Sequence, residues 1–258
     1  MNTSRQTAVM QGDAHTHTNR RAATRKEGTV KPTTAKLIRW AGLSAMAAGI
    51  LFVVIQPLHP AETLSSVTTS RWAIVHSVTV TMCLLLLLGV TGLYARQVEE
   101  AGWLGLAGYL LFSLCWALQM PYGFAEAVIL PRLANDAPGF VQSFLGLYNG
   151  SPGEMNLGAL ATVYTFSGFL YILGGLLFGL ATLRAGILPR WAAAVLAVGA
   201  VAPLAIALVP HEFQRIAAVP MGLGLAWLGA ALWSERREQA AEPVPGRGSP
   251  QLRPTGAE

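Results

Sequence analysis

Three apolar stretches of the sequence carry polar side chains at helical spacing. Within each stretch the polar residues are three, four or seven positions apart, so they form one stripe along a helix. The three stripes are His76, Thr79 and Cys83; Cys115, Gln119, Tyr122 and Glu126; and Tyr164, Ser167 and Tyr171. Side chains that hydrogen-bond should face protein or water rather than lipid when they lie in hydrocarbon.

The stripes also lie at similar heights along their helices. At about 1.5 Å per residue, they extend from roughly 18 to 30 Å above the ends expected to face the cytoplasm. The inner halves, such as LLLLLGVTGL from Leu84 and ILGGLLFGLATL from Ile172, are almost free of polar groups. We therefore predict an outward-facing polar pocket with a packed apolar floor. The residues predicted to bind a ligand there are His76, Thr79, Gln119, Tyr122, Glu126, Tyr164 and Ser167.

Each chemical role in this pocket has a structural alternative. An ionisable group inside a membrane is costly and usually functional, so His76 and Glu126 could form an acid/base couple. His76 is also only about one turn below the outer surface, where it could reach interfacial water, as could Glu126. Tyr122 and Tyr164 could belong to the aromatic belt at the membrane surface. The sequence identifies no catalytic residue.

Metal and cofactor sites have little support. His59, Glu62, His211 and Glu212 end the outer halves of two spans and could join His76 in a metal site, but no spacing matches a zinc motif. A haem held by two histidines is not expected, because only His76 is deeply placed. No metal is therefore predicted, and the cofactor stays unknown.

The elements that must position the stripes are membrane-spanning helices. Of the 258 residues 53% are hydrophobic and only 12% are charged, against roughly a quarter charged in soluble domains. The apolar residues form blocks of the length, about 20 residues, that crosses a bilayer core. The predicted fold class is an all-α polytopic bundle with six spans, near 38–57, 72–95, 103–127, 158–183, 190–209 and 215–233. Cys83 and Cys115 fall inside apolar blocks and are expected to behave as small buried hydrophobes.

The charge distribution predicts the orientation. Residues 1–36 are expected to be a disordered basic cytoplasmic tail, 37–234 the membrane domain, and 235–258 a second disordered cytoplasmic tail. With both termini inside, 15 of the 18 Lys and Arg residues are cytoplasmic and three (Arg71, Arg132 and Arg215) are outside. The excess beside the first span suits anionic lipid rather than nucleic acid. The composition resembles that of a bacterial chain, which predicts the bacterial plasma membrane.

The six spans resemble one hairpin used three times. RWAGLSAMAAG, GWLGLAGYLL and RWAAAVLAVGA open the odd spans, and each odd span ends at a proline. They would be parallel repeats about an axis along the membrane normal, although interfacial Trp and terminal Pro are features of any hairpin. In the loop between 131 and 157, PGFVQSFLGLY has the spacing of a short helix on the outer interface.

The chain resembles a group of bacterial multi-pass membrane proteins with no established activity. The resemblance rests on GLYARQVEEAGWLGLAGYLL, EAVILPRLANDAP and LFGLATLRAGILPRWAAAVLAVGA, and covers about residues 38–234. It implies a topology and no chemistry. Three functions stay open: a protein that binds a small or lipid-like ligand, which we prefer; a secondary transporter; and a membrane-embedded enzyme at the outer leaflet.

Overall fold

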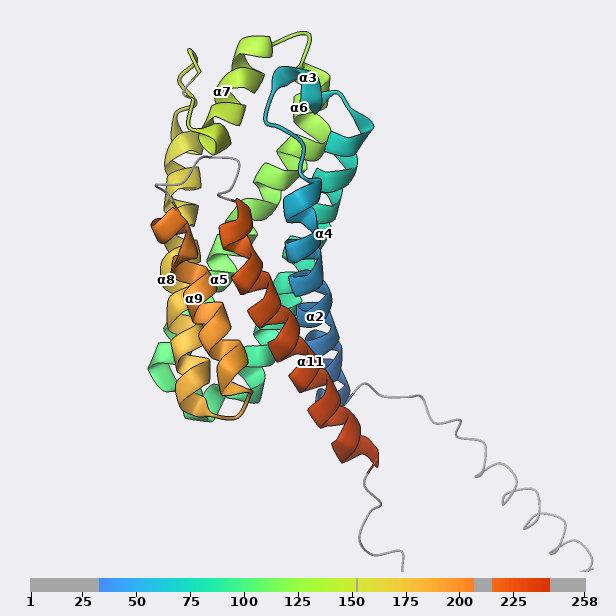
Figure 1. The fold of residues 1–258 in the computed structure, drawn as a ribbon, viewed down its shortest axis with the longest axis vertical. Coiled ribbons are helices and arrows are strands. Elements are labelled where there is room, and N and C mark those ends of the chain that lie inside the picture. Colours follow the sequence, from blue (N-terminus) through green and yellow to red (C-terminus); the bar gives the residue numbers. More distant parts are fainter. Residues whose placement is uncertain (1–32, 152, 207–214, 242–258) are drawn as a thin grey trace, which may run out of the picture. The chain divides into compact units, whose positions relative to one another are not determined.

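The computed structural model describes residues 33–151, 153–206 and 215–241, and over these residues the regular structure is entirely helical (Figure 1). Six long helices make up the bundle: α2 (Thr34–Leu58), α4 (Ser70–Arg96), α5 (Val98–Phe124), α8 (Ala159–Ala185), α9 (Arg190–Ile206) and α11 (Val219–Ala241). The short elements are α3 (Leu64–Val67), η1 (Ala125–Ile129), α6 (Leu130–Leu133), α7 (Pro138–Asn149) and η2 (Arg215–Ala218). These helices belong to one compact unit that begins at Thr34.

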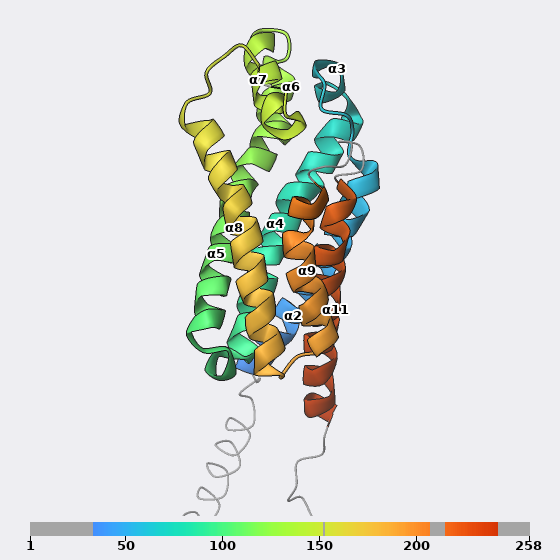
Figure 2. The same ribbon diagram turned by 60° about the vertical axis from the view of Figure 1, so that its left-hand side comes forward.

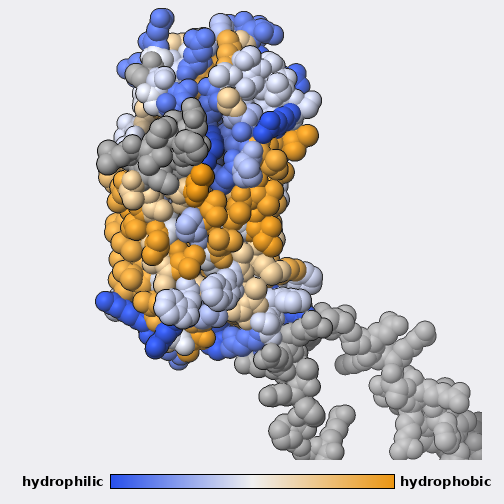
Figure 3. Space-filling model, in the orientation of Figure 1, coloured by the Kyte–Doolittle hydropathy of each residue, from blue (hydrophilic) through white to orange (hydrophobic). Residues whose placement is uncertain are grey.

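The prediction of an all-α bundle with about six spans is confirmed. Five segments are long and apolar enough to cross a membrane: Thr34–Leu58, Ser70–Arg96, Val98–Leu133, Ala159–Ala185 and Arg215–Glu235. The sixth predicted span is represented by the shorter apolar α9, of 17 residues. Figure 3 shows, on one face of the bundle, a hydrophobic band across the middle between two hydrophilic ends. The chain is an integral membrane protein.

The six long helices form a closed ring in sequence order. Each packs against the helices that precede and follow it, and α11 closes the ring by packing against α2 (Figures 1 and 2). The three predicted hairpins therefore occupy successive positions around the bundle. A simple up-and-down bundle has the same arrangement, so their origin by duplication stays a prediction. Exposed tryptophans near the starts of α2, α5 and α9 lie at one end of the bundle, as interfacial anchors do: Trp40, Trp103 and Trp191.

Glycines let the ring close. Gly42 and Gly49 on α2 face Gly222 and Gly229 on α11, two pairs that are each seven residues apart on one helix face. A Cβ atom at Gly42 would lie 2.9 Å from the backbone nitrogen of Trp233, and one at Gly49 would overlap the backbone of Gly222. Small residues at such a contact allow the close packing that holds helices together in lipid.

The boundaries differ from the predicted ones at both ends of the domain. The first helix begins at Thr34, inside the predicted tail, and α11 continues to Ala241 rather than ending near 234. At the base of the bundle Arg96 Nε donates to both carboxylate oxygens of Glu235, at 3.0 and 3.1 Å, and so ties α4 to α11. The rest of the predicted tails, 1–32 and 242–258, lies outside the described residues.

The predicted short helix after residue 131 is present as α7. Its apolar face does not project away from the protein, because Phe144 is buried and packs with Trp72, Tyr122 and Leu130 in a second core at this end of the bundle. Protein contacts therefore account for its amphipathic pattern. Its contact with a membrane surface stays a prediction.

Candidate functional site

A cavity of about 240 Å³ lies inside the bundle, at the end that carries α3, α6 and α7. Its volume has room for roughly eight water molecules. The titratable residues at its polar end come from five different segments and are His59, Glu62, His76, Glu126, Tyr148 and Arg215. The uncharged polar residues of its wall are Gln56, Thr79 and Gln119. Nearer the middle of the bundle the wall is mainly apolar and aromatic: Phe52, Met82, Cys83, Trp116 and Tyr171.

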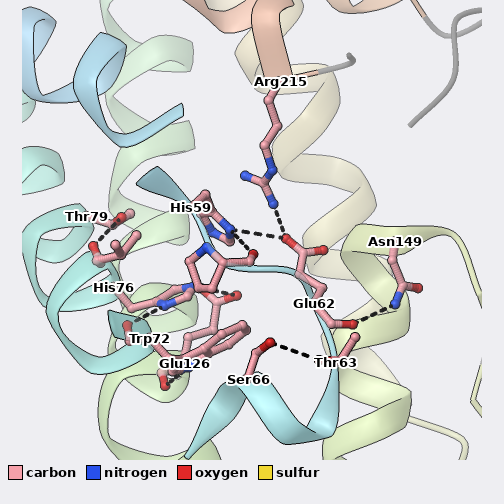
Figure 4. A network of polar contacts seen from close by, with 12 residues as sticks. His59, Glu62, Thr63, Ser66, Trp72, His76, Thr79, Glu126, Asn149 and Arg215 are labelled. Atoms are coloured by element: carbon pink, nitrogen blue, oxygen red, sulfur yellow. Dashed lines mark hydrogen bonds and ion pairs between the residues drawn. The ribbon is translucent and has the colours of Figure 1, made fainter. Parts of the chain in front are cut away.

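The hydrogen bond of His76 determines which face the ring presents to the cavity. Its Nδ1 lies 2.8 Å from the carbonyl oxygen of Trp72, one turn earlier on α4. A carbonyl only accepts, so Nδ1 carries the proton and Nε2 of the neutral ring is an acceptor. Nε2 lies 3.6 Å from Oε1 of Glu126, beyond hydrogen-bonding distance, and the side chain is only 1% exposed (Figure 4).

Glu126 is placed by a local widening of its helix. Pro121 has no backbone N–H and interrupts the α-helical pattern of α5. The π-helical turn η1 begins four residues later, at Ala125; it contains Glu126 and is the kind of turn often found at functional sites. The indole Nε1 of Trp72 donates to the carbonyl oxygen of Glu126 at 2.8 Å, which fixes this turn against α4.

Tyr148 on α7 stands beside the Glu126 carboxyl group. Burial, and then the negative charge of Glu126, raise the pKa of Tyr148 well above its ordinary value. The phenol therefore keeps its proton at neutral pH and is a hydrogen-bond donor toward Glu126. Through this contact α7 completes the wall of the cavity.

An ion pair joins two distant segments across the same end of the bundle. Arg215, on η2, is paired with the carboxylate of Glu62, which is 4% exposed and lies between α2 and α3 (Figure 4). The Asn149 amide donates to the carbonyl oxygen of Glu62 at 3.2 Å and links the same loop to α7. The ring of His59 packs edge to face on His76, with centroids 4.9 Å apart.

His59 is expected to make the protein less stable in acid. Burial, and then the charge of Arg215, lower the pKa of His59 from 6.5 to about 3. Unfolded His59 takes up a proton near pH 6.5 while the folded side chain does not until about pH 3, so stability falls as the pH drops through this window. The loss is at most about 1.4 kcal/mol per pH unit. His59→Gln should flatten the dependence of melting temperature on pH between 6 and 4; an unchanged slope would contradict the assignment.

Three buried polar atoms on the cavity wall have no hydrogen-bond partner among the described residues. They are Nε2 of His76, Nε1 of Trp116 and the hydroxyl oxygen of Tyr171. The ring of Trp116 packs edge to face on both Phe52 and Tyr171, with centroids 5.4 and 6.0 Å away. Two donors near the floor and one acceptor near the polar end are therefore available to a molecule in the cavity.

The structure brings together part of the set predicted from the sequence. His76, Thr79, Gln119 and Glu126 line the cavity. The remaining three lie beside it, at the contact between α5 and α8, and are Tyr122, Tyr164 and Ser167. Tyr122 donates to the carbonyl oxygen of Leu160 at 2.6 Å, and Ser167 donates to that of Tyr164 at 2.7 Å. Ligand binding by any of the seven stays a prediction.

The sequence prediction omitted several residues of the wall. Tyr171 belongs to the third stripe and is the member that reaches the cavity, and Trp116 lies one position after Cys115. The sequence predicts Tyr148 as the end of a short interfacial helix and Arg215 as one of three basic residues on the outside. The one sequence feature that could have indicated a role for Arg215 in the site is its position as a charged residue at the start of an apolar span.

The possible outer metal site does not form among the described residues, which contain no group of three His, Cys, Asp or Glu side chains placed to hold a metal ion. His211 and Glu212 lie outside that part of the chain. Cys83 and Cys115 are buried free thiols; Cys83 lines the cavity, whereas Cys115 donates to the carbonyl oxygen of Ser167 at 3.4 Å.

Comparison with known proteins adds no homologue. No protein-family model, curated protein or solved structure matches this chain.

Proposed function

We propose that this integral membrane protein binds a small organic molecule in the cavity lined by His76, Glu126, Trp116 and Tyr171. The observation that carries the proposal is a set of three buried polar atoms on one cavity wall that have no hydrogen-bond partner within the described part of the chain. Each such atom costs about 1–3 kcal/mol when it stays unpaired. A ligand with an acceptor at one end and a donor at the other would satisfy all three.

The contacts around the cavity support a binding site rather than a channel through the membrane. At its polar end α4 is joined to η1, and both η2 and α7 are joined to the loop that carries Glu62, by contacts that need no ligand. In the other half of the bundle α5 and α8 approach so closely that a Cβ atom at Gly108 would overlap the backbone of Phe178. Such a packed floor suits a protein that holds its ligand.

Native mass spectrometry of the detergent-purified protein tests this proposal. We expect a bound mass of a few hundred daltons or less in the wild type, largely lost in His76→Leu, which replaces the acceptor Nε2 with an apolar group. Thr81→Ala is the matched control, because Thr81 is exposed on the same helix and donates only to the carbonyl of Ser77. A wild type without bound mass, or equal occupancy in all three proteins, would contradict the proposal.

The second candidate is an enzyme at the outer leaflet, favoured by the separation of 3.6 Å between Nε2 of His76 and Oε1 of Glu126. An imidazole acceptor and a carboxyl group at that distance can take and return one proton. Turnover of the bound molecule, abolished in His76→Leu, would distinguish this candidate. A secondary transporter is the third candidate, and uptake into vesicles would identify it.

The orientation and the host membrane belong to the same proposal. The positive-inside rule supports cytoplasmic termini, with the cavity toward the outside and the basic first tail on anionic lipid. The resemblance to bacterial multi-pass proteins supports the bacterial plasma membrane.

A further inference from the structure

His76 and Glu126, which face each other at the polar end of the cavity, present acceptor atoms to a ligand. Nδ1 of His76 donates to the carbonyl oxygen of Trp72, so Nε2, which faces Glu126, has a lone pair that can accept a hydrogen bond. The Glu126 carboxyl group stands opposite, and the side chain is 6% exposed. His59 likewise uses Nδ1, at 2.8 Å, on the carbonyl oxygen of Pro60. A molecule that lies between His76 and Glu126 must therefore supply hydrogen-bond donors to these two side chains.

The protein's own positive charge at this end is already matched. Arg215 is the only Lys or Arg among the described residues that line the cavity, and it is paired with Glu62. The low pKa of His59 keeps that ring neutral at physiological pH. An ionised Glu126 consequently has no Lys or Arg partner among the described lining residues, and a buried carboxylate requires a matching charge.

The deeper part of the cavity supplies aromatic surface. Phe52, Trp116 and Tyr171 pack edge to face there, and Tyr148 lies nearer the polar end. From His76 to Cys83, both on the wall, α4 rises about 10 Å. A compact molecule with an aromatic or aliphatic body could therefore have one end at Glu126 and the other near Trp116. Aromatic faces also attract cations.

We propose that the cavity selects a small organic cation, a primary or secondary ammonium whose N–H groups donate to the Glu126 carboxylate and to Nε2 of His76. Its apolar body lies against Trp116 and Tyr171, whose N–H and O–H groups have no acceptor among the residues that the structure describes and can donate to an acceptor on that body. This inference rests on the proposed binding function and names the ligand class. It assigns Glu126 as the anchor and His76 as the second acceptor.

Three probes of one shape test the charge preference: 2-phenylethylamine, 2-phenylethanol and phenylacetate. Each is titrated to 10 mM against the detergent-purified protein, and the melting temperature is followed. We expect a saturable rise with the amine, about 5 °C at a hundredfold excess over its dissociation constant. The alcohol should give a smaller rise, and the carboxylate should give none.

Two separate variants, one in the cavity and one as a control, then each remove one carboxylate. Glu126→Gln should make the amine and the alcohol equivalent, because shape and hydrogen-bonding capacity remain while the charge is lost. Glu154→Gln removes a carboxylate from an exposed residue outside the cavity and should leave the preference for the amine unchanged. The wild-type comparison of the three probes needs no variant, so it decides the matter even if Glu126→Gln does not fold.

The possible outcomes separate the inference from the function on which it rests. Equal stabilisation by amine and alcohol would overturn the cation preference while leaving small-molecule binding intact. Strongest stabilisation by phenylacetate would overturn it in favour of Arg215 as the anchor. No stabilisation by any probe would also overturn the inference, and the bound mass in native spectra would then decide the proposed function by itself.

Discussion

Replacing Gly49 with alanine is expected to disrupt the bundle, although it adds a single methyl group. A Cβ atom at this position would overlap the carbonyl oxygen of Gly222 and the backbone nitrogen of Ala226 on α11. Backbone atoms cannot rotate away, so α2 and α11 would have to separate along the contact that closes the ring. Overpacking of this kind costs about 1–3 kcal/mol, and larger substitutions should prevent folding. The measurement is the fraction of monodisperse protein in size-exclusion chromatography, with its melting temperature.

Gly168→Ala provides the matched control. Gly168 is also inside a long apolar helix, α8, but a Cβ atom there would meet nothing within 4 Å. We expect this variant to be at least as stable as the wild type, since alanine favours a helix by about 1 kcal/mol relative to glycine. Equal stability of the Gly49 and Gly168 variants would show that the α2–α11 contact is looser than described.

Loss of Arg215 is expected to be the most destabilising change at the cavity. Its partner Glu62 has a side chain that is 4% exposed, whereas Arg215 itself is 32% exposed. Removing one member of a buried pair costs about 3–5 kcal/mol, and the partial exposure of the guanidinium places the expected loss for Arg215→Gln nearer 2–3 kcal/mol. Chemical denaturation in detergent would measure it.

The ion pair between Arg96 and Glu235, at the opposite end of the bundle, is a control for the pair between Arg215 and Glu62. Arg96 and Glu235 are 21% and 29% exposed, so Arg96→Gln should cost at most about 1 kcal/mol. The double variant Glu62→Gln/Arg215→Gln should recover much of the stability lost in Arg215→Gln, because the buried negative charge is removed with its partner. Equal losses for Arg215→Gln and Arg96→Gln, without recovery in the double variant, would refute the importance of burial.

The membrane bundle could be predicted from the sequence because its signal is local. A block of about 20 apolar residues can satisfy its backbone in lipid only as a helix, so α2, α4 and α8 were found almost to their ends. The extension of α11 to Ala241 was missed because its last turns are polar and resemble a tail. The order of helices around the ring depends on contacts such as Gly49 against Gly222, which no local pattern encodes.

The sequence predicts a residue of the site only where its position on one helix face determines whether it lines the cavity. His76 and Thr79 point into the cavity because they share the inner face of α4, and Gln119 and Glu126 do so on α5. Tyr122 lies at the edge of that face, and its hydroxyl is used by Leu160 on α8 instead. Spacing gives the relative angle of two residues on a helix, but the rotation of the helix toward its neighbours sets which of them reaches the cavity.

Cavity residues that come from distant segments cannot be predicted from spacing along one helix. Tyr148 and Arg215 reach the cavity from α7 and η2, through a fold that brings these elements against α2 and α5. The position of Glu126 depends further on the π-helical turn after Pro121, which rotates the carboxyl group relative to a regular helix.

Ligand binding in the cavity is tested most directly by an experimental density map of the purified protein at a resolution that shows side chains and ordered water. We expect density for an organic molecule between Glu126 and Trp116, with atoms within hydrogen-bonding distance of His76 Nε2, Trp116 Nε1 and the Tyr171 hydroxyl. A cavity filled by ordered water alone, or side chains rearranged so that these three atoms pair within the protein, would contradict this expectation.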